Sequence, residues 1–224
     1  MSDEACYDKI LDILQSGEQP QFIFTVTMQN HSGYNQGGIP ADKMMPYADF
    51  GNAKLDDNTN CLIKEYLACI GESDRALKDF VSQLRKLDRP VLLVFFGDHQ
   101  PSFTKEYNDA WFTDETRAAH IARQYQTHYI MWANYDVAGN EQNNDKRFPA
   151  ASSLASHLLD AIGAPLTDFQ KAQIALGEEL PGIGHYTTLS ADGNWYFPDD
   201  KNAPSYTLQT ELQKMSYHNF AERV

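Results

Sequence analysis

Asp98 and His99 are adjacent residues whose side chains could together bind a metal ion. A carboxylate beside a neutral imidazole suits Zn²⁺, Mn²⁺ or a similar divalent cation. Such a cation can neutralise phosphate or sulfate oxygens while a bond to that group is displaced. The alternative is an ordinary turn in which Asp98 caps backbone amides and His99 is merely polar, since Asp is a favoured turn residue. The surrounding sequence distinguishes the two.

The residues before Asp98 predict a strand that ends at the pair. Val91–Phe96 is an unbroken apolar run rich in β-branched and aromatic residues, as expected for a strand buried on both faces of a parallel sheet. Gly97 ends this run, and Pro101 prevents the strand from continuing. Ligands of open α/β sheets bind just beyond the carboxyl ends of the strands. This order of residues favours the metal-binding interpretation.

A second histidine follows a second predicted strand. Phe22–Met28 has the length and composition of a strand, and the polar loop Gln29–Tyr34 comes next. This loop carries His31, so a histidine again stands at the carboxyl end of an apolar run. The alternative role for His31 is a loop histidine that hydrogen-bonds to the backbone.

The string Gly-Asp-His-Gln-Pro at 97–101 resembles the second metal-ligand motif of the sulfatase-like branch of the alkaline phosphatase superfamily. Within that branch it is most similar to the lipoteichoic acid synthases and related phosphoglycerol transferases. The resemblance implies that Asp98 and His99 bind the catalytic divalent ion, commonly Mn²⁺, with Zn²⁺ and Mg²⁺ as alternatives. These transferases also carry a strand followed by Asn-His, which implies that His31 contacts the substrate phosphate. An imidazole can donate a hydrogen bond to a phosphoryl oxygen.

The same resemblance predicts an α/β fold of the alkaline phosphatase/sulfatase type, with a mostly parallel sheet flanked by helices and a small C-terminal β hairpin. Helical spacing of apolar residues predicts one long helix, or two, over residues 58–87. This region resembles the family's helix before the Gly-Asp-His strand, so the flanking strands form a right-handed crossover. We therefore expect two parallel strands to end side by side and to bring His31 to Asp98 and His99, around a shared anion-receiving cleft.

The resemblance extends over about residues 3–220 but covers only the later half of the family's catalytic domain. The earlier half carries a Thr or Ser nucleophile and a Glu metal ligand, for which this sequence offers no candidate. Residues 1–224 are therefore predicted to form a single partial sulfatase-like domain, with no catalytic residue of its own. Catalytic metal sites usually have three protein ligands, so we expect weak metal binding and little or no turnover. The missing half would be a partner, and a sheet edge would be exposed where it docks.

The predicted function is the metal-binding half of a phosphoglycerol transferase-like enzyme, which would move glycerol phosphate from a lipid donor to a cell-envelope polymer. Its membrane-anchored parent would work at the extracellular face of the bacterial membrane. Two alternatives stay open: a sulfatase or phosphatase fragment, because the motif serves both kinds of ester, and a non-catalytic binding module on a decayed enzyme fold. Other branches use a late histidine as a further ligand, but the lipoteichoic acid synthases do not need one, so His185 stays outside the predicted site.

The composition is that of an ordinary soluble globular protein, with 42% hydrophobic and 22% charged residues among 224. The formal net charge of −13 disfavours nucleic acid as a partner, because an acidic surface repels phosphate backbones. An anionic substrate would need local positive charge, which a bound metal ion can supply. Cys6, Cys61 and Cys69 are too few for a disulfide framework. The sequence shows neither a signal peptide nor a run of membrane-spanning length.

The remaining predictions place secondary structure along the chain. Gly71 is a candidate break in the long helix, and the Gly- and Pro-containing loop at 36–57 is long enough to shape a site. The other expected elements are helices at 3–15, 150–162, about 166–176 and 207–220, a strand at 127–134, and a hairpin over 187–197 that turns at Asp192-Gly193.

Overall fold

The computed structural model describes residues 2–31, 33–34, 36–44, 55–101, 109, 112–137, 150–177 and 179–221. The chain falls into two compact units. The first unit comprises residues 1–91 and 101–113, and the second comprises residues 92–100 and 114–224. Neither unit contains, within these ranges, a helix long and apolar enough to cross a membrane.

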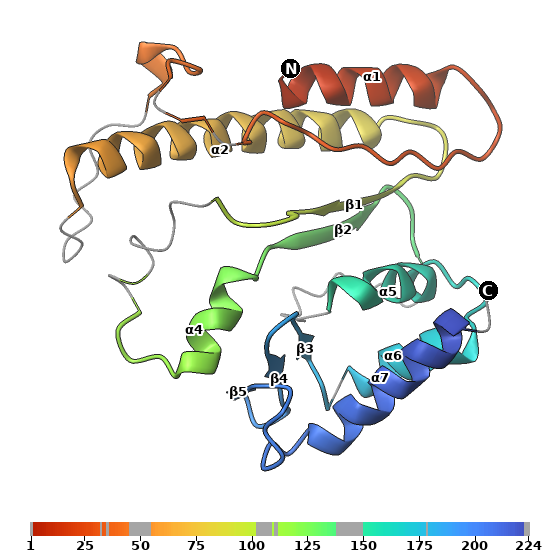
Figure 1. Ribbon diagram of the computed structural model, residues 1–224. Helices are drawn as coiled ribbons and strands as arrows, with labels where there is room; N and C mark the ends of the chain where they lie inside the picture. Colours follow the sequence, from red (N-terminus) through yellow and green to blue (C-terminus); the bar gives the residue numbers. More distant parts are fainter. Residues whose placement is uncertain are drawn as a thin grey trace. The chain divides into compact units, whose positions relative to one another are not determined.

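The first unit is built on a pair of helices joined by a long connection (Figure 1). Its elements are α1 (Asp3–Gln15), the short 3-10 helix η1 (Ala41–Lys43) and α2 (Asp57–Leu84). Ser2 caps α1 by accepting a hydrogen bond from the Ala5 N–H, and Asp56 caps α2 through the Thr59 N–H. Both helices therefore begin at residues whose side chains satisfy an otherwise unpaired backbone donor. α2 runs without a break through Gly71.

The two helices meet in an apolar core. The ring of Tyr7 on α1 stacks on that of Phe80 on α2, with centroids 4.6 Å apart and planes 9° from parallel. Ile63 and Leu84 are almost fully buried on the same face of α2. Arg89, after α2, donates hydrogen bonds to the carbonyl oxygens of three residues at the end of α1 and just beyond it: Leu14, Gly17 and Gln19. These contacts hold the connection that leaves α1.

The strand predicted over Phe22–Met28 is not formed, because this segment does not pair into a β-sheet in the described structure. The exposure of its side chains alternates only in part. Phe22, Phe24, Val26 and Met28 are 88%, 68%, 61% and 55% exposed; of the residues between them, Ile23 and Thr27 are half-buried and Thr25 is exposed. We call these four side chains the exposed apolar row. Within the described part of the chain, no strand pairs with this segment.

In its described residues the second unit combines two small sheets with the helices α4 to α7 (Figure 1). Its elements are β1 (Leu92–Phe96), α4 (Arg117–Gln124), β2 (Tyr129–Ala133), η2 (Ala151–Ser153), α5 (Leu154–Ala161), α6 (Asp168–Leu176), β3 (Gly182–Ile183), β4 (Thr188–Leu189), β5 (Trp195–Tyr196) and α7 (Tyr206–Ala221). β1 pairs antiparallel with β2, in the register that runs from Leu92–Ala133 to Phe96–Tyr129. β3, β4 and β5 form an antiparallel sheet in that order.

The α/β content agrees with the prediction, but the mostly parallel sheet does not, because every strand pair in the described residues is antiparallel. The predicted crossover is not formed either, since the segment before α2 is not a strand there. The apolar run at 91–96 suggested a strand covered on both faces. In the structure Phe96 on β1 and Ile130 on β2, which lie on opposite faces of the strand pair, remain 44% and 49% exposed. Each face of the pair therefore keeps an exposed apolar side chain within the described residues.

Local signals place the later elements where they were predicted. Thr167 and Gln170 form a reciprocal capping box at the start of α6. Gly163 ends the α5 segment with a φ of +68°, and Gly193 turns the β4–β5 hairpin with a φ of +81°. The predicted strand at 127–134 is present as β2, and the helix at 207–220 as α7. Part of the predicted 36–57 loop, residues 45–54, lies outside the described residues.

Candidate metal and phosphate site

The loop that follows β1 is tied to the segment that leads into β2. The Gly97 N–H donates to the His128 carbonyl oxygen at 3.0 Å, and the Thr127 hydroxyl donates to the Gly97 carbonyl oxygen at 2.8 Å. A Cβ at position 97 would lie 3.2 Å from the Thr127 Cβ, closer than nearly all real contacts of that kind. Glycine therefore suits the close approach of the two segments.

Gln100 holds the far end of the same loop. Its Nε2 donates hydrogen bonds of 2.7 Å to two carbonyl oxygens at the end of α4, those of Arg123 and Gln126. The loop of residues 97–100 is thus fixed to the rest of the second unit on both sides of Asp98 and His99. Neither predicted ligand takes part in that anchoring.

Asp98 and His99 present one polar atom each toward the other. Asp98 Oδ1 accepts a hydrogen bond of 2.8 Å from the His99 N–H, and His99 Nδ1 lies 3.0 Å from the Gln100 carbonyl oxygen. When Nδ1 donates that bond, Nε2 keeps its lone pair. Asp98 Oδ2 and His99 Nε2 then lie 3.4 Å apart. The side chains are 75% and 69% exposed, so both atoms are open to a ligand.

The chemistry of this pair fits a divalent cation. Two ligands about 2.1 Å from a tetrahedral metal lie roughly 3.4 Å from each other, which matches the separation of these oxygen and nitrogen atoms. Within the described residues, however, no group of three or more His, Cys, Asp or Glu side chains could hold a metal ion. The pair could therefore supply part of a coordination shell, and its role as metal ligand stays a prediction.

His31 belongs to the first unit and lies at the end of a turn, in which its N–H donates to the Met28 carbonyl oxygen at 3.2 Å. Its side chain is exposed. The two residues before it are fixed by α2: the Gln29 and Asn30 side-chain amides donate to the Ser73 hydroxyl oxygen at 3.3 and 3.0 Å. The structure thus gives His31 a rigid base, and its convergence with Asp98 stays a prediction.

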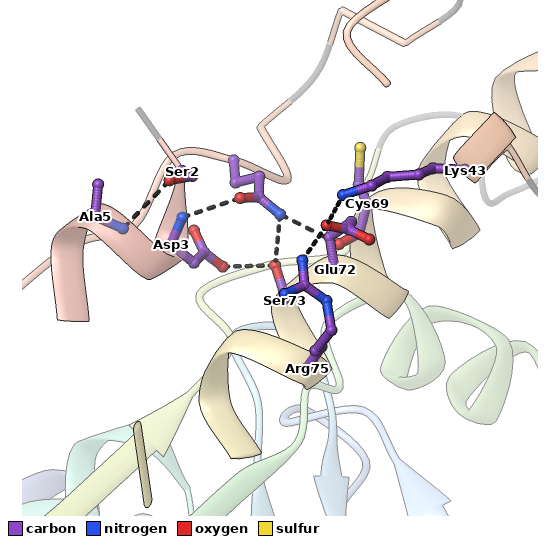
Figure 2. A network of polar contacts seen from close by, with 9 residues as sticks. Ser2, Asp3, Ala5, Lys43, Cys69, Glu72, Ser73 and Arg75 are labelled. Atoms are coloured by element: carbon purple, nitrogen blue, oxygen red, sulfur yellow. Dashed lines mark hydrogen bonds and ion pairs between the residues drawn. The ribbon is translucent and has the colours of Figure 1, made fainter. Parts of the chain in front are cut away.

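Ser73 is the centre of the polar network that anchors residues Gln29–His31, here named the histidine loop (Figure 2). Its hydroxyl donates to Asp3 Oδ2 at 2.5 Å, while the Asp3 N–H donates to Gln29 Oε1 at 2.9 Å. The hydroxyl group thus bridges the first turn of α1, the middle of α2 and the loop before His31. Ser73 and Asp3 are both buried. Sequence reasoning missed both residues, because their contact joins positions 70 apart in the chain.

Ion pairs and a buried carboxylate hold the next segment onto α2. Glu72 pairs with Lys43 of η1 at 2.9 Å and with Arg75 (Figure 2). The hydrogen bond from Lys43, followed by that from Arg75, lowers the pKa of Glu72 below its ordinary value. About two helical turns before Glu72 on α2, the buried Glu65 accepts hydrogen bonds from the backbone N–H groups of Gln36 and Gly38, at 3.2 and 2.8 Å. The 36–44 segment is therefore fixed to the same helix as the histidine loop.

Comparison with known proteins gives the following matches. The family model described as Sulfatase matches residues 1–164. A putative cyclic β-1,2-glucan modification protein of Rhizobium meliloti (strain 1021) is 24% identical over 139 residues, which are 59% of this chain and 21% of that protein. The capsular polysaccharide biosynthesis protein RkpI of the same organism is 35% identical over 95 residues, 41% of this chain and 14% of that protein. The chain thus spans less than a third of the length of these relatives.

A solved structure shows the same fold. The Streptococcus pyogenes phosphoglycerol transferase GacH, in complex with sn-glycerol-1-phosphate, superposes with a TM-score of 0.64 at 19% sequence identity. The match covers 96% of this chain and 47% of GacH. The likeness therefore extends over nearly all of this chain and about half of the other.

Proposed function

The chain belongs to the sulfatase family, and on this premise we propose that it is the metal-binding half of a phosphoglycerol transferase-like enzyme. The complete enzyme would transfer glycerol phosphate from a lipid donor to a polymer of the bacterial cell envelope. The fold neighbour is a phosphoglycerol transferase bound to a glycerol phosphate, and two relatives are named for glucan modification and capsular polysaccharide biosynthesis. The observation that carries the proposal is the facing of Asp98 Oδ2 and His99 Nε2 at 3.4 Å.

In this proposal Asp98 and His99 hold a divalent cation. Proteins of this superfamily generally use divalent metals, and we propose Mn²⁺ for this chain. The ion would act as a Lewis acid that withdraws charge from a phosphoryl oxygen. Local positive charge matters here, because the chain as a whole carries a formal charge of −13 and repels an anionic substrate.

His31 would donate a hydrogen bond from its imidazole to another oxygen of the substrate phosphate. Its anchoring supports this role. The Gln29 and Asn30 amides tie the histidine loop to Ser73, so the loop loses little conformational freedom when a ligand binds. A loop held in this way can present an imidazole to a small anion without a large rearrangement.

The attacking nucleophile and the remaining metal ligands would be supplied by sulfatase-family sequence beyond these 224 residues. The matches support this division, since the chain covers 47% of the structural neighbour and 21% and 14% of the two Rhizobium meliloti relatives. The exposed apolar row is the surface on which we propose that the other half packs. Four apolar side chains on one side of an extended segment form a face that a neighbouring β-element can cover. The parent enzyme would be membrane-anchored, with its active site outside the cell.

Isothermal titration calorimetry on the purified chain tests the site directly. Mn²⁺ is titrated first, and sn-glycerol-1-phosphate is then titrated with and without saturating Mn²⁺. We expect weak Mn²⁺ binding that His99→Ala abolishes, and glycerol phosphate binding that requires the metal. His31→Ala should weaken glycerol phosphate binding and leave Mn²⁺ binding unchanged. His218→Ala, an exposed histidine on α7, is the matched control.

Three results would contradict the proposal. If glycerol phosphate binds equally well with and without Mn²⁺, the substrate does not bind through the metal ion. Equal effects of His31→Ala and His218→Ala would remove the role of His31. Robust phosphodiesterase turnover by the 224-residue chain would show that the nucleophile is already present. Inorganic sulfate binding as tightly as glycerol phosphate would instead favour the sulfatase alternative.

A further inference from the structure

The second unit contains an open aromatic pocket between α4 and the β3–β5 sheet, apart from the Asp98–His99 pair. Its volume is about 490 Å³, within the range of roughly 300–1,000 Å³ that is usual for small-molecule sites. α4, the turn between β3 and β4, and the residues after β5 line it. Its lining includes Arg117, Ile121, Tyr125, His185, Tyr186 and Phe197.

The aromatic rings of the pocket pack on one another and keep faces open to solvent. Tyr125 and Tyr186 lie with ring centroids 5.3 Å apart, tilted by 59°. His185 meets Tyr186 edge-on at 4.3 Å. The two tyrosines nevertheless remain 55% and 48% exposed. Such rings offer an apolar face together with a hydroxyl that hydrogen-bonds, a combination suited to a ligand with both apolar and polar surfaces.

Arg117 adds a positive charge at the edge of the same pocket. Its guanidinium carbon lies 5.7 Å from the centre of the Phe197 ring, which orients the group by a cation–π contact. Across the described ranges no carboxylate forms an ion pair with Arg117. An oriented guanidinium without a carboxylate partner suits an incoming phosphate, which it can bind through two parallel N–H donors.

We propose that the aromatic pocket binds a phosphorylated hexose unit of the glycan that the enzyme modifies. The C–H face of the sugar ring would lie on Tyr125 and Tyr186, and its phosphate would pair with Arg117. His185 would hydrogen-bond to a sugar hydroxyl. A pocket that prefers a phosphorylated sugar would bind a glycan acceptor to which a phosphate group is already attached. The identification of the sugar as part of a glycan acceptor rests on the proposed function, whereas the pocket and its chemistry do not.

Nuclear magnetic resonance on chain labelled with ¹⁵N-tyrosine tests this inference without any activity assay. The amide signals of Tyr125 and Tyr186 are assigned by Tyr→Phe substitution, and glucose 6-phosphate, glucose and inorganic phosphate are titrated separately. We expect both signals to shift with glucose 6-phosphate at a concentration at least fivefold lower than with glucose. The signal of Tyr217, an exposed tyrosine on α7, should not move. Arg117→Gln should remove the preference for the phosphorylated sugar, whereas Lys171→Gln on α6 should retain it.

The inference is overturned if neither tyrosine signal shifts with glucose 6-phosphate, or if inorganic phosphate alone produces the same shifts. It is also overturned if Arg117→Gln leaves the preference intact. Asp98→Asn separates this inference from the proposed function. The variant should lose Mn²⁺ binding and keep the sugar-dependent shifts, so either proposal can fail without the other.

Discussion

His99 Nε2 faces Asp98 Oδ2 at 3.4 Å because the backbone engages the other polar atom of each side chain. The His99 N–H occupies Asp98 Oδ1, and the Gln100 carbonyl oxygen lies beside His99 Nδ1. Both side chains are therefore oriented before any ligand arrives. Orientation of a ligating imidazole by a backbone carbonyl is a common feature of metal sites.

Removing either member of this pair is expected to weaken metal binding strongly. Asp98→Asn and His99→Ala should each weaken Mn²⁺ binding by about tenfold or more in calorimetry. Gln100→Ala should weaken it less, because the loop loses its anchor to the Arg123 and Gln126 carbonyls but both ligands remain. Binding that survives in both Asp98→Asn and His99→Ala would place the metal elsewhere.

Ser73→Ala is expected to destabilise the chain and to loosen the histidine loop. The substitution leaves the buried carboxylate of Asp3 and the Gln29 and Asn30 amides without their shared partner, at a cost of about 1–3 kcal/mol in the free energy of unfolding. Urea unfolding measures that loss. The matched control is Ser82→Ala on the same helix, whose hydroxyl donates only to the Lys78 carbonyl oxygen in an exposed turn. Equal losses for both variants would show that the network is not cooperative.

Polar substitution in the exposed apolar row is expected to leave the stability of this chain almost unchanged. Phe24→Ser should change the free energy of unfolding by no more than about 0.5 kcal/mol, since the ring is 68% exposed. Phe80→Ala, which removes a buried ring, should cost about 3–5 kcal/mol. In the complete enzyme Phe24→Ser should become strongly destabilising. If it stays neutral there, the row is not covered by the other half.

Tyr7→Phe is expected to stabilise the chain and to reduce its sensitivity to alkali. Burial, followed by the charges of Asp3 and Cys6, raises the pKa of Tyr7 from 10.0 to about 12. The folded state thus holds this proton more tightly than the unfolded state, so its contribution is complete below pH 10 and is lost as the pH rises from 10 to about 12.

The same substitution removes a buried hydroxyl that has no hydrogen-bond partner in the part of the chain that the structure describes. Tyr7→Phe should therefore gain about 1 kcal/mol at neutral pH and show a shallower decline of stability between pH 10 and 12. Denaturant unfolding at a series of pH values measures both effects, with the exposed Tyr217→Phe as the control. A destabilised Tyr7→Phe would show that the hydroxyl has a partner, such as a bound water.

Helix ends were predictable because their signals are local. Ser2 and Thr167 cap α1 and α6 through side chains within three residues of the amides they bind. The family and its sulfatase-like α/β fold were likewise predicted from a local string, residues 97–101, and are confirmed by the family match and the fold neighbour. Strand pairing is not local. Phe22–Met28 has the composition of a strand, but a strand also needs a neighbour, and none of the described segments provides one.

The same difference between local and long-range signals applies to the candidate site. Asp98 and His99 were predicted because they are adjacent and follow a recognisable apolar run, and their role stays a prediction. Ser73 was missed because its importance arises only when α1 and the histidine loop are brought to it. The aromatic pocket was also missed, since it gathers Arg117, His185 and Phe197 from three separate segments. His185 had been weighed only as a metal ligand, whereas its neighbours are tyrosine rings.

The continuity of α2 has a consequence for the two segments that are attached to it. Glu65 fixes the 36–38 backbone, and Ser73 fixes the histidine loop, eight positions or about 12 Å further along one rigid rod. The helix continues through Gly71, so the spacing between Glu65 and Ser73 stays constant. A displacement of α2 along its axis would carry both loops by the same amount. A substitution that shifts α2 would therefore reach both the loop before His31 and the 36–38 backbone.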